Sequence, residues 1–101
     1  MTIRLVPPTV VLVPGAPIPA FTFNPSNPAV GDTVIFNASG SVDLDGSIVS
    51  YMWEWGDGES VTRLTPAEDH DFPASGTYYV KLTLTDNSGL KSTLTKPINV
   101  Q

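Results

Sequence analysis

The stretch Tyr51–Gly58 constrains the fold more than any other part of this 101-residue chain. Tyr51, Trp53 and Trp55 are spaced two residues apart, so in a β-strand their rings point to one face. Gly56-Asp57-Gly58 follows at once, and Asp-Gly is among the strongest hairpin signals. Large rings on one face of a strand that ends in a tight turn indicate the centre of a β-sandwich. We therefore interpret both tryptophans as core residues rather than as rings that stack on sugars.

Short alternating runs separated by turn residues continue along the chain, and no segment shows a helical period. In the predicted strand 47–55, which contains Tyr51, Trp53 and Trp55, the alternation also places Val49 on the inner face. The segment 64–73 is interpreted as irregular and acidic, and Pro97 indicates an edge strand or a bulge. The pattern predicts an all-β antiparallel sandwich of about seven strands. The predicted strands are 18–24, 33–38, 47–55, 59–63, 77–85 and 90–100.

Composition excludes several classes of function. The net charge is −5 and the five basic residues are scattered, so nucleic acid and anionic membranes are poor partners. The chain has no cysteine, which excludes disulfides, thiol catalysis and zinc sites of the cysteine type. No run is long enough for a transmembrane helix, so we expect no membrane insertion. The length suits one domain, which we expect to be a monomer when isolated.

The first 17 residues contain four prolines, at positions 7, 8, 14 and 17. Proline fixes φ and favours extended conformations, so this part is interpreted as a semi-rigid linker between modules. The alternative is that Val10–Val13 forms an edge strand of the domain itself. In either case the sandwich domain is expected to span residues 18–101.

Motifs in a fixed order carry a resemblance to a known family. The chain strongly resembles the PKD domain (polycystic kidney disease repeat) of microbial type, and the resemblance covers roughly residues 18–101. Trp55 stands where the family usually has Phe, and Pro19 where a small residue is common. The motifs are Gly31-Asp32-Thr33-Val34-Ile35-Phe36-Asn37-Ala38-Ser39-Gly40-Ser41, Asp43-x-Asp45-Gly46, Trp53-x-Trp55-Gly56-Asp57-Gly58, His70, and Gly76-Thr77-Tyr78 followed by Thr85-Asp86.

The resemblance implies an immunoglobulin-like sandwich without catalytic activity that works outside the cell or on its surface. It implies an accessory module of a larger secreted or cell-surface protein. Such a module spaces neighbouring domains and contacts proteins or polysaccharides. Two alternatives follow from the family: a structural module stiffened by calcium, and a substrate-binding aid of an enzyme of the chitinase or protease type.

Asp43, Asp45 and Asp86 are the candidate metal ligands. Asp43-x-Asp45-Gly46 is a small acidic loop of the kind that wraps a hard cation, and calcium takes six to eight oxygens. Asp86 follows another long strand and is expected at the same end of the sandwich. The resemblance implies that these three residues hold calcium in some relatives, with further ligands from Asn or Ser near position 16, where this chain has none. The alternative is that Asp43 only caps the loop through backbone N–H groups.

The remaining candidates have weaker signals. Tyr79 is the one ring that points outward from its strand, which makes it the candidate for carbohydrate binding. Asp57 lies between two glycines and is interpreted as a turn former. His70 is the only histidine and is interpreted as structural, with its ring bonded to backbone. No nucleophile with a partner base is identifiable, so we expect no catalytic residues, no enzyme activity and no required cofactor.

Overall fold

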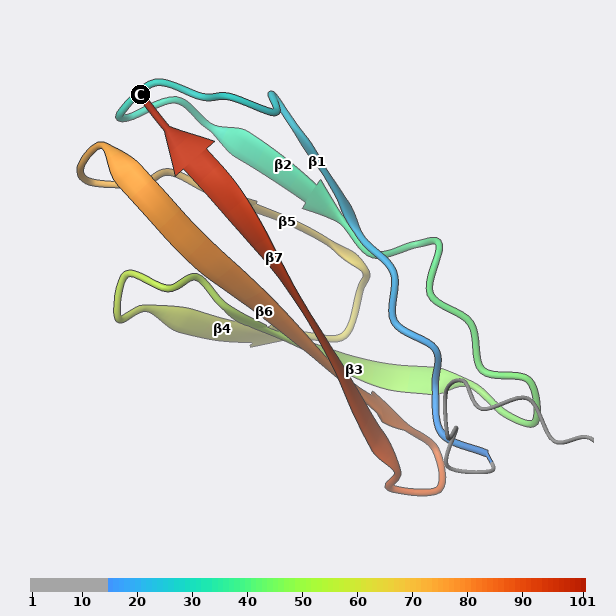
Figure 1. Ribbon diagram of the computed structural model, residues 1–101. Coiled ribbons are helices and arrows are strands. Elements are labelled where there is room, and N and C mark those ends of the chain that lie inside the picture. The colour runs from blue at the N-terminus through green and yellow to red at the C-terminus, as the bar shows by residue number, and fades with distance from the viewer. Residues whose placement is uncertain (1–14) are drawn as a thin grey trace, which may run out of the picture.

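The computed structural model describes residues 15–101 and shows two antiparallel sheets packed face to face (Figure 1). One sheet has the order β1-β2-β5, and the other has the order β4-β3-β6-β7. This confirms the predicted all-β sandwich of seven strands. The strands are β1 (Thr22–Asn24), β2 (Val34–Asn37), β3 (Ile48–Glu54), β4 (Ser60–Arg63), β5 (Ala67–His70), β6 (Gly76–Asp86) and β7 (Lys91–Val100).

Residues 15–101 contain no helix long and apolar enough to cross a membrane. The two alternatives for the proline-rich start concern residues 1–17. Of these, 1–14 lie outside the described residues, so both alternatives stay predictions.

Strands β6 and β7 form the longest hairpin and run the length of the domain. They pair from Gly76↔Val100 to Thr85↔Lys91. Along β6, alternate side chains are apolar and buried, because Val80, Leu82 and Leu84 face the second sheet. Strand β7 lies at the edge of its sheet, so the prediction from Pro97 is confirmed: an edge strand accommodates a residue without an N–H donor.

The core is a cluster of aromatic rings centred on Phe36 of β2. The Phe36 ring lies 4.8 Å from the ring of Trp55 and 5.6 Å from that of Trp53, between centroids. Phe21, Phe23 and Phe72 also pack against it. Trp53 and Trp55 are 0% and 2% exposed, which confirms that they are core residues.

The two tryptophans stack on each other and on His70. Their rings are 5.4 Å apart with an interplanar angle of 1°, and Trp55 stacks on His70 at 4.4 Å and 6°. His70 belongs to the three-stranded sheet, whereas the tryptophans belong to β3 and its continuation. The stack therefore crosses from one sheet to the other.

The prediction that Val49 faces inward is wrong. The register between β3 and β6 shifts between Ile48 and Ser50, where one residue is inserted as a bulge. The bulge turns Val49 outward, to 43% exposure, and leaves Ile48 packed against the core. Alternation counted backwards from Trp53 does not reveal such an insertion.

The segment 64–73 is also more regular than predicted. Its residues 67–70 form β5, which pairs with β2 from Val34↔His70 to Asn37↔Ala67. The sequence Ala67-Glu68-Asp69-His70 contains no residue that favours strands, so the pairing with β2 determines the conformation rather than local propensity. The predicted first strand is correspondingly shorter: β1 covers 22–24, and Ile18 forms only an isolated bridge with Val42.

Replacing Phe36 by Ala tests the role of this ring at the centre of the core. We expect Phe36→Ala to lower the free energy of unfolding by about 3–5 kcal/mol, because it removes a buried ring and leaves a cavity. Ile35→Ala is the matched control, since Ile35 is the neighbouring residue on β2 and 48% exposed. Urea unfolding followed by tryptophan fluorescence measures both variants. Equal losses for the two variants would contradict this description of the core.

Candidate functional site

The structure brings Asp43, Asp45 and Asp86 together at one end of the sandwich. One carboxylate oxygen from each lies within 4.8 Å of the others. The arrangement follows from the pairing of β3 with β6: Ile48 pairs with Asp86, so the loop that precedes β3 folds over the end of β6. The predicted convergence of Asp86 with the acidic loop is therefore observed.

Two of these carboxylates, those of Asp43 and Asp86, accept hydrogen bonds from backbone N–H groups. Asp43 Oδ1 accepts a hydrogen bond from the Asp45 N–H at 3.3 Å, which is the predicted Asx-type cap. Asp86 is 2% exposed, and its Oδ1 accepts bonds from the N–H groups of Ser88 and Leu90 at 2.9 and 2.8 Å. One oxygen each of Asp43 and Asp86 thus stabilises a turn.

The second oxygen of Asp43 has no such role. Asp43 Oδ2 is buried and has no hydrogen-bond partner among the described residues. A buried acceptor without a partner destabilises a fold by about 1–3 kcal/mol unless another group satisfies it. Because carboxylate oxygens of Asp45 and Asp86 lie within 4.8 Å of that of Asp43, a cation would match the charge of this position.

The pKa of Asp43 is raised above its ordinary value. Burial is the largest cause, and the neighbouring carboxyl groups of Asp45 and Asp86 add to it, while the Asp45 N–H acts in the opposite direction. A carboxyl whose pKa is higher in the folded state than in the unfolded state opposes folding once the pH rises above both values. In the metal-free protein, the ionised Asp43 therefore lowers the stability of the fold at neutral pH.

The residues fit a calcium ion incompletely. The three carboxylates supply hard oxygen ligands, but calcium takes six to eight of them. Gly15 lies directly against the Asp45 carboxylate: a Cβ at this position would lie 2.8 Å from Asp45 Oδ2, and Gly15 has a φ of +84°. The segment after Gly15 contributes no side-chain oxygen, so backbone carbonyls and water would have to complete the coordination.

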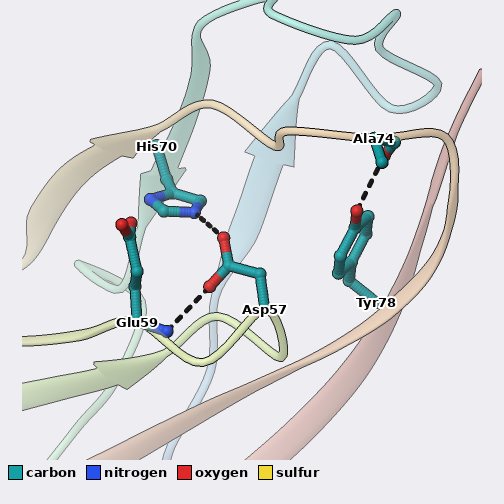
Figure 2. Close-up of polar contacts among 5 residues, drawn as sticks. All are labelled: Asp57, Glu59, His70, Ala74 and Tyr78. Atoms are coloured by element: carbon teal, nitrogen blue, oxygen red, sulfur yellow. Dashed lines mark hydrogen bonds and ion pairs between the residues drawn. The ribbon is translucent and has the colours of Figure 1, made fainter.

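A second polar cluster lies at the opposite end of β3, and the sequence analysis missed it. It consists of Asp57, Glu59 and His70, whose donor atoms also lie within 4.8 Å of one another. His70 Nε2 is 2.7 Å from Asp57 Oδ2, and both side chains are buried, with 9% and 5% exposure. Asp57 Oδ1 accepts a bond from the Glu59 N–H at 2.9 Å, which confirms its role in the turn (Figure 2).

The predicted backbone partner of His70 is therefore wrong, because its ring pairs with a carboxylate. The hairpin turn positions that carboxylate. The Trp55 N–H donates to the Glu59 C=O and closes the turn. Gly56 has a φ of +84°, and a Cβ at this position would lie only 2.9 Å from the backbone of Tyr79, so the turn requires glycine here. The Asp57-x-Glu59 spacing and the one histidine were the available signals, but nothing local predicts that β5 brings His70 to this turn.

A groove of about 440 Å³ separates the two edge strands β4 and β5. Glu59, Val61 and Arg63 line one side, and Glu68 and His70 line the other. An ion pair between Arg63 and Glu68 spans the groove at one end. The Asp57–His70 pair spans it at the other end, so polar contacts connect the two sheets where no backbone pairing does.

The structure places Tyr79 as predicted for a ring outside the core. It is 64% exposed on the outer face of β6, next to Pro97 of β7. No second aromatic ring among residues 15–101 reaches that exposure. One exposed ring next to a proline provides a small flat surface rather than an extended platform.

The fold and these sites define an immunoglobulin-like β-sandwich module. The family model of the PKD domain matches residues 15–101, and the chain belongs to this family. The PKD1 domain from the Vibrio cholerae metalloprotease PrtV has a similar structure, with a TM-score of 0.73, 32% identity, and coverage of 85% of this chain and 98% of that domain. The PKD modules of collagenases and metalloproteases are non-catalytic accessory modules.

Two curated relatives are bacterial collagenases. A microbial collagenase of Vibrio alginolyticus is 38% identical over 83% of this chain. Collagenase ColQ1 of Bacillus cereus is 40% identical over 67% of this chain. The chain spans only 10% and 7% of the length of these relatives, respectively.

A further solved chain comes from a study of the promiscuous specificity of carbohydrate-binding modules of the β-sandwich superfamily. Its TM-score is 0.83 and its identity 45%, and the match covers 85% of this chain and 34% of that chain.

Proposed function

We propose that this domain is a non-catalytic accessory module of a larger secreted or cell-surface protein, in which it holds neighbouring domains apart at a fixed orientation. The relatives support this proposal, because the chain matches only a small part of collagenases that act as larger proteins. The same relatives support an extracellular location. The main support for the spacer role is that the two ends of the described chain lie far apart on the domain.

The described chain enters and leaves at opposite ends of the sandwich (Figure 1). Gly15 lies against Asp45, in the loop that leads into β3. Gln101 follows β7 and exchanges backbone hydrogen bonds with Pro28 and Val30 at the other end. The ten residues of β7 span about 33 Å at the usual rise per residue of a strand. Domains attached at the two ends would therefore be separated by roughly this length of paired strand.

Distance measurements between the two ends test the spacer role. The chain has no cysteine, so an Ala16→Cys/Gln101→Cys variant carries spin labels only at these positions. Double electron–electron resonance should give one narrow distribution centred at roughly 30–40 Å, since β7 bridges the two ends. The same protein in urea is the control for a flexible chain. A broad distribution in the folded protein, or a mean below about 20 Å, would contradict the spacer role.

We further propose that calcium binds at Asp43, Asp45 and Asp86 and stiffens the junction at Gly15. The buried Asp43 Oδ2 without a partner supports this proposal, as does the concentration of three carboxylates without an ion-pair partner among residues 15–101. A bound ion would offset the repulsion among them. It would also link the loop to β6, next to the segment where the chain enters the domain.

Thermal unfolding with calcium and with chelator tests this site. A ligand in hundredfold excess over its Kd stabilises the folded state by about 2.7 kcal/mol, which for a domain of this size is a rise in Tm of roughly 10–20 °C. Asp45→Asn should abolish most of this rise. Asp69→Asn, which alters an exposed carboxylate on β5, should retain it. An unchanged Tm in calcium would contradict the site.

Contact with a polysaccharide at Tyr79 is a second candidate function. The exposure of this ring supports it, as does the likeness to a chain studied for carbohydrate-binding modules. A ring that stacks on a sugar loses its contact area when it is truncated. In a pull-down on insoluble chitin, cellulose and collagen, Tyr79→Ala should reduce the bound fraction several-fold, while Val49→Ala on the neighbouring strand should not. Equal binding by both variants would place the contact elsewhere.

A further inference from the structure

We propose that His70 and Glu59 form a binding site for a divalent transition-metal ion of the zinc class, in the groove between β4 and β5. Asp57 acts there as a positioning residue for His70. This site is separate from the acidic loop, because the two clusters lie at opposite ends of β3. The proposal does not depend on the spacer role.

The first argument concerns the two nitrogens of the His70 ring. Nε2 is engaged with Asp57 Oδ2 at 2.7 Å. An ionised carboxylate only accepts hydrogen bonds, so in the neutral imidazole Nε2 carries the proton and Nδ1 keeps a free lone pair. Nδ1 has no hydrogen-bond partner among residues 15–101, although the side chain is only 9% exposed and lines the groove. In that form, a largely buried imidazole presents an unused lone pair to the groove.

The second argument concerns Glu59. Figure 2 shows its side chain beside the His70 ring, on the side away from Asp57. A carboxylate oxygen of Glu59 lies within 4.8 Å of the other two donors of the cluster. Its backbone N–H donates to Asp57 Oδ1, so one carboxylate positions both ligands. The position of Glu59 therefore depends on the turn and not on a flexible loop.

The donor set selects the kind of metal. Calcium and magnesium prefer oxygen ligands, whereas an imidazole nitrogen with a carboxylate suits zinc and neighbouring transition metals. A histidine that ligates a metal usually donates its other N–H to a carboxylate, which is the arrangement of Asp57 and His70. Zinc prefers four ligands, and the groove of about 440 Å³ leaves space for water at the remaining positions.

The single histidine of the chain provides a direct reporter for the test. The tag-free protein, labelled with ¹⁵N, is titrated with Zn²⁺ while the ring nitrogens are observed by NMR. Without metal, the spectrum should show the Nε2–H tautomer. Zn²⁺ should shift the Nδ1 resonance to saturation, and Ca²⁺ at the same concentrations should not. The Nδ1–H tautomer, or no saturable shift with Zn²⁺, would overturn the proposal.

Variants distinguish the site from general binding to an acidic surface. Glu59 is exposed, so Glu59→Gln should fold normally and raise the Kd for Zn²⁺ at least about tenfold. Asp57→Asn should raise it roughly 10–100-fold, the range usual for residues that orient a ligand. Glu54→Gln, which removes a carboxylate on β3 that belongs to neither cluster, is the matched control and should leave the Kd unchanged. Equal affinity of Glu59→Gln and wild type would show that Glu59 is no ligand.

Discussion

The stack of Trp53, Trp55 and His70 is the interaction on which the rest of the structure depends. It starts in the four-stranded sheet and ends on a residue of the three-stranded sheet, so it fixes the two sheets relative to each other. Phe36 packs against both tryptophans from the opposite sheet. In proteins generally, each aromatic side chain buries about 150–250 Å². A small domain buries little apolar area in total, so such a cluster supplies a large share of its hydrophobic stabilisation.

The position of the stack determines where polar chemistry is found. The tryptophans fill the middle of the sandwich, so charged groups gather at the two ends of β3. At one end, the loop before β3 meets the end of β6 and concentrates three carboxylates. At the other end, the hairpin turn meets β5 and brings Asp57 and Glu59 to His70. The tryptophans themselves are closed to ligands, because both are buried.

The sequence predicted those features that follow from local pattern. The parity of Tyr51, Trp53 and Trp55, the turn at Asp57, and the edge position of β7 from Pro97 are all of this kind. The bulge before Ser50 could not be predicted in this way, because one inserted residue reverses the parity of Val49 without changing composition. Strand β5 could not be predicted either, since only its pairing with β2 makes Ala67–His70 extended.

The two candidate sites differ in the same respect. The convergence of Asp43, Asp45 and Asp86 was predictable, since a spaced pair of carboxylates and a residue at the end of a long strand are visible in the sequence. The cluster at His70 was not, because it needs the unexpected strand β5 to bring His70 to the turn. Contacts between polar groups across the open edge of the sandwich depend on how the two sheets pack, so the local sequence does not predict them.

We infer that the aromatic core folds without an ion and supports a junction at Gly15 whose stiffness depends on calcium at the acidic loop. Amide hydrogen exchange, in chelator and in calcium, tests it most directly. We expect amides of β2, β3 and β6 around the core to exchange slowly in both conditions. We expect amides of 15–18 and 43–47 to exchange fast in chelator and to become protected in calcium. Protection that is unchanged by calcium in these two segments, or a core that exchanges fast without it, would contradict the account.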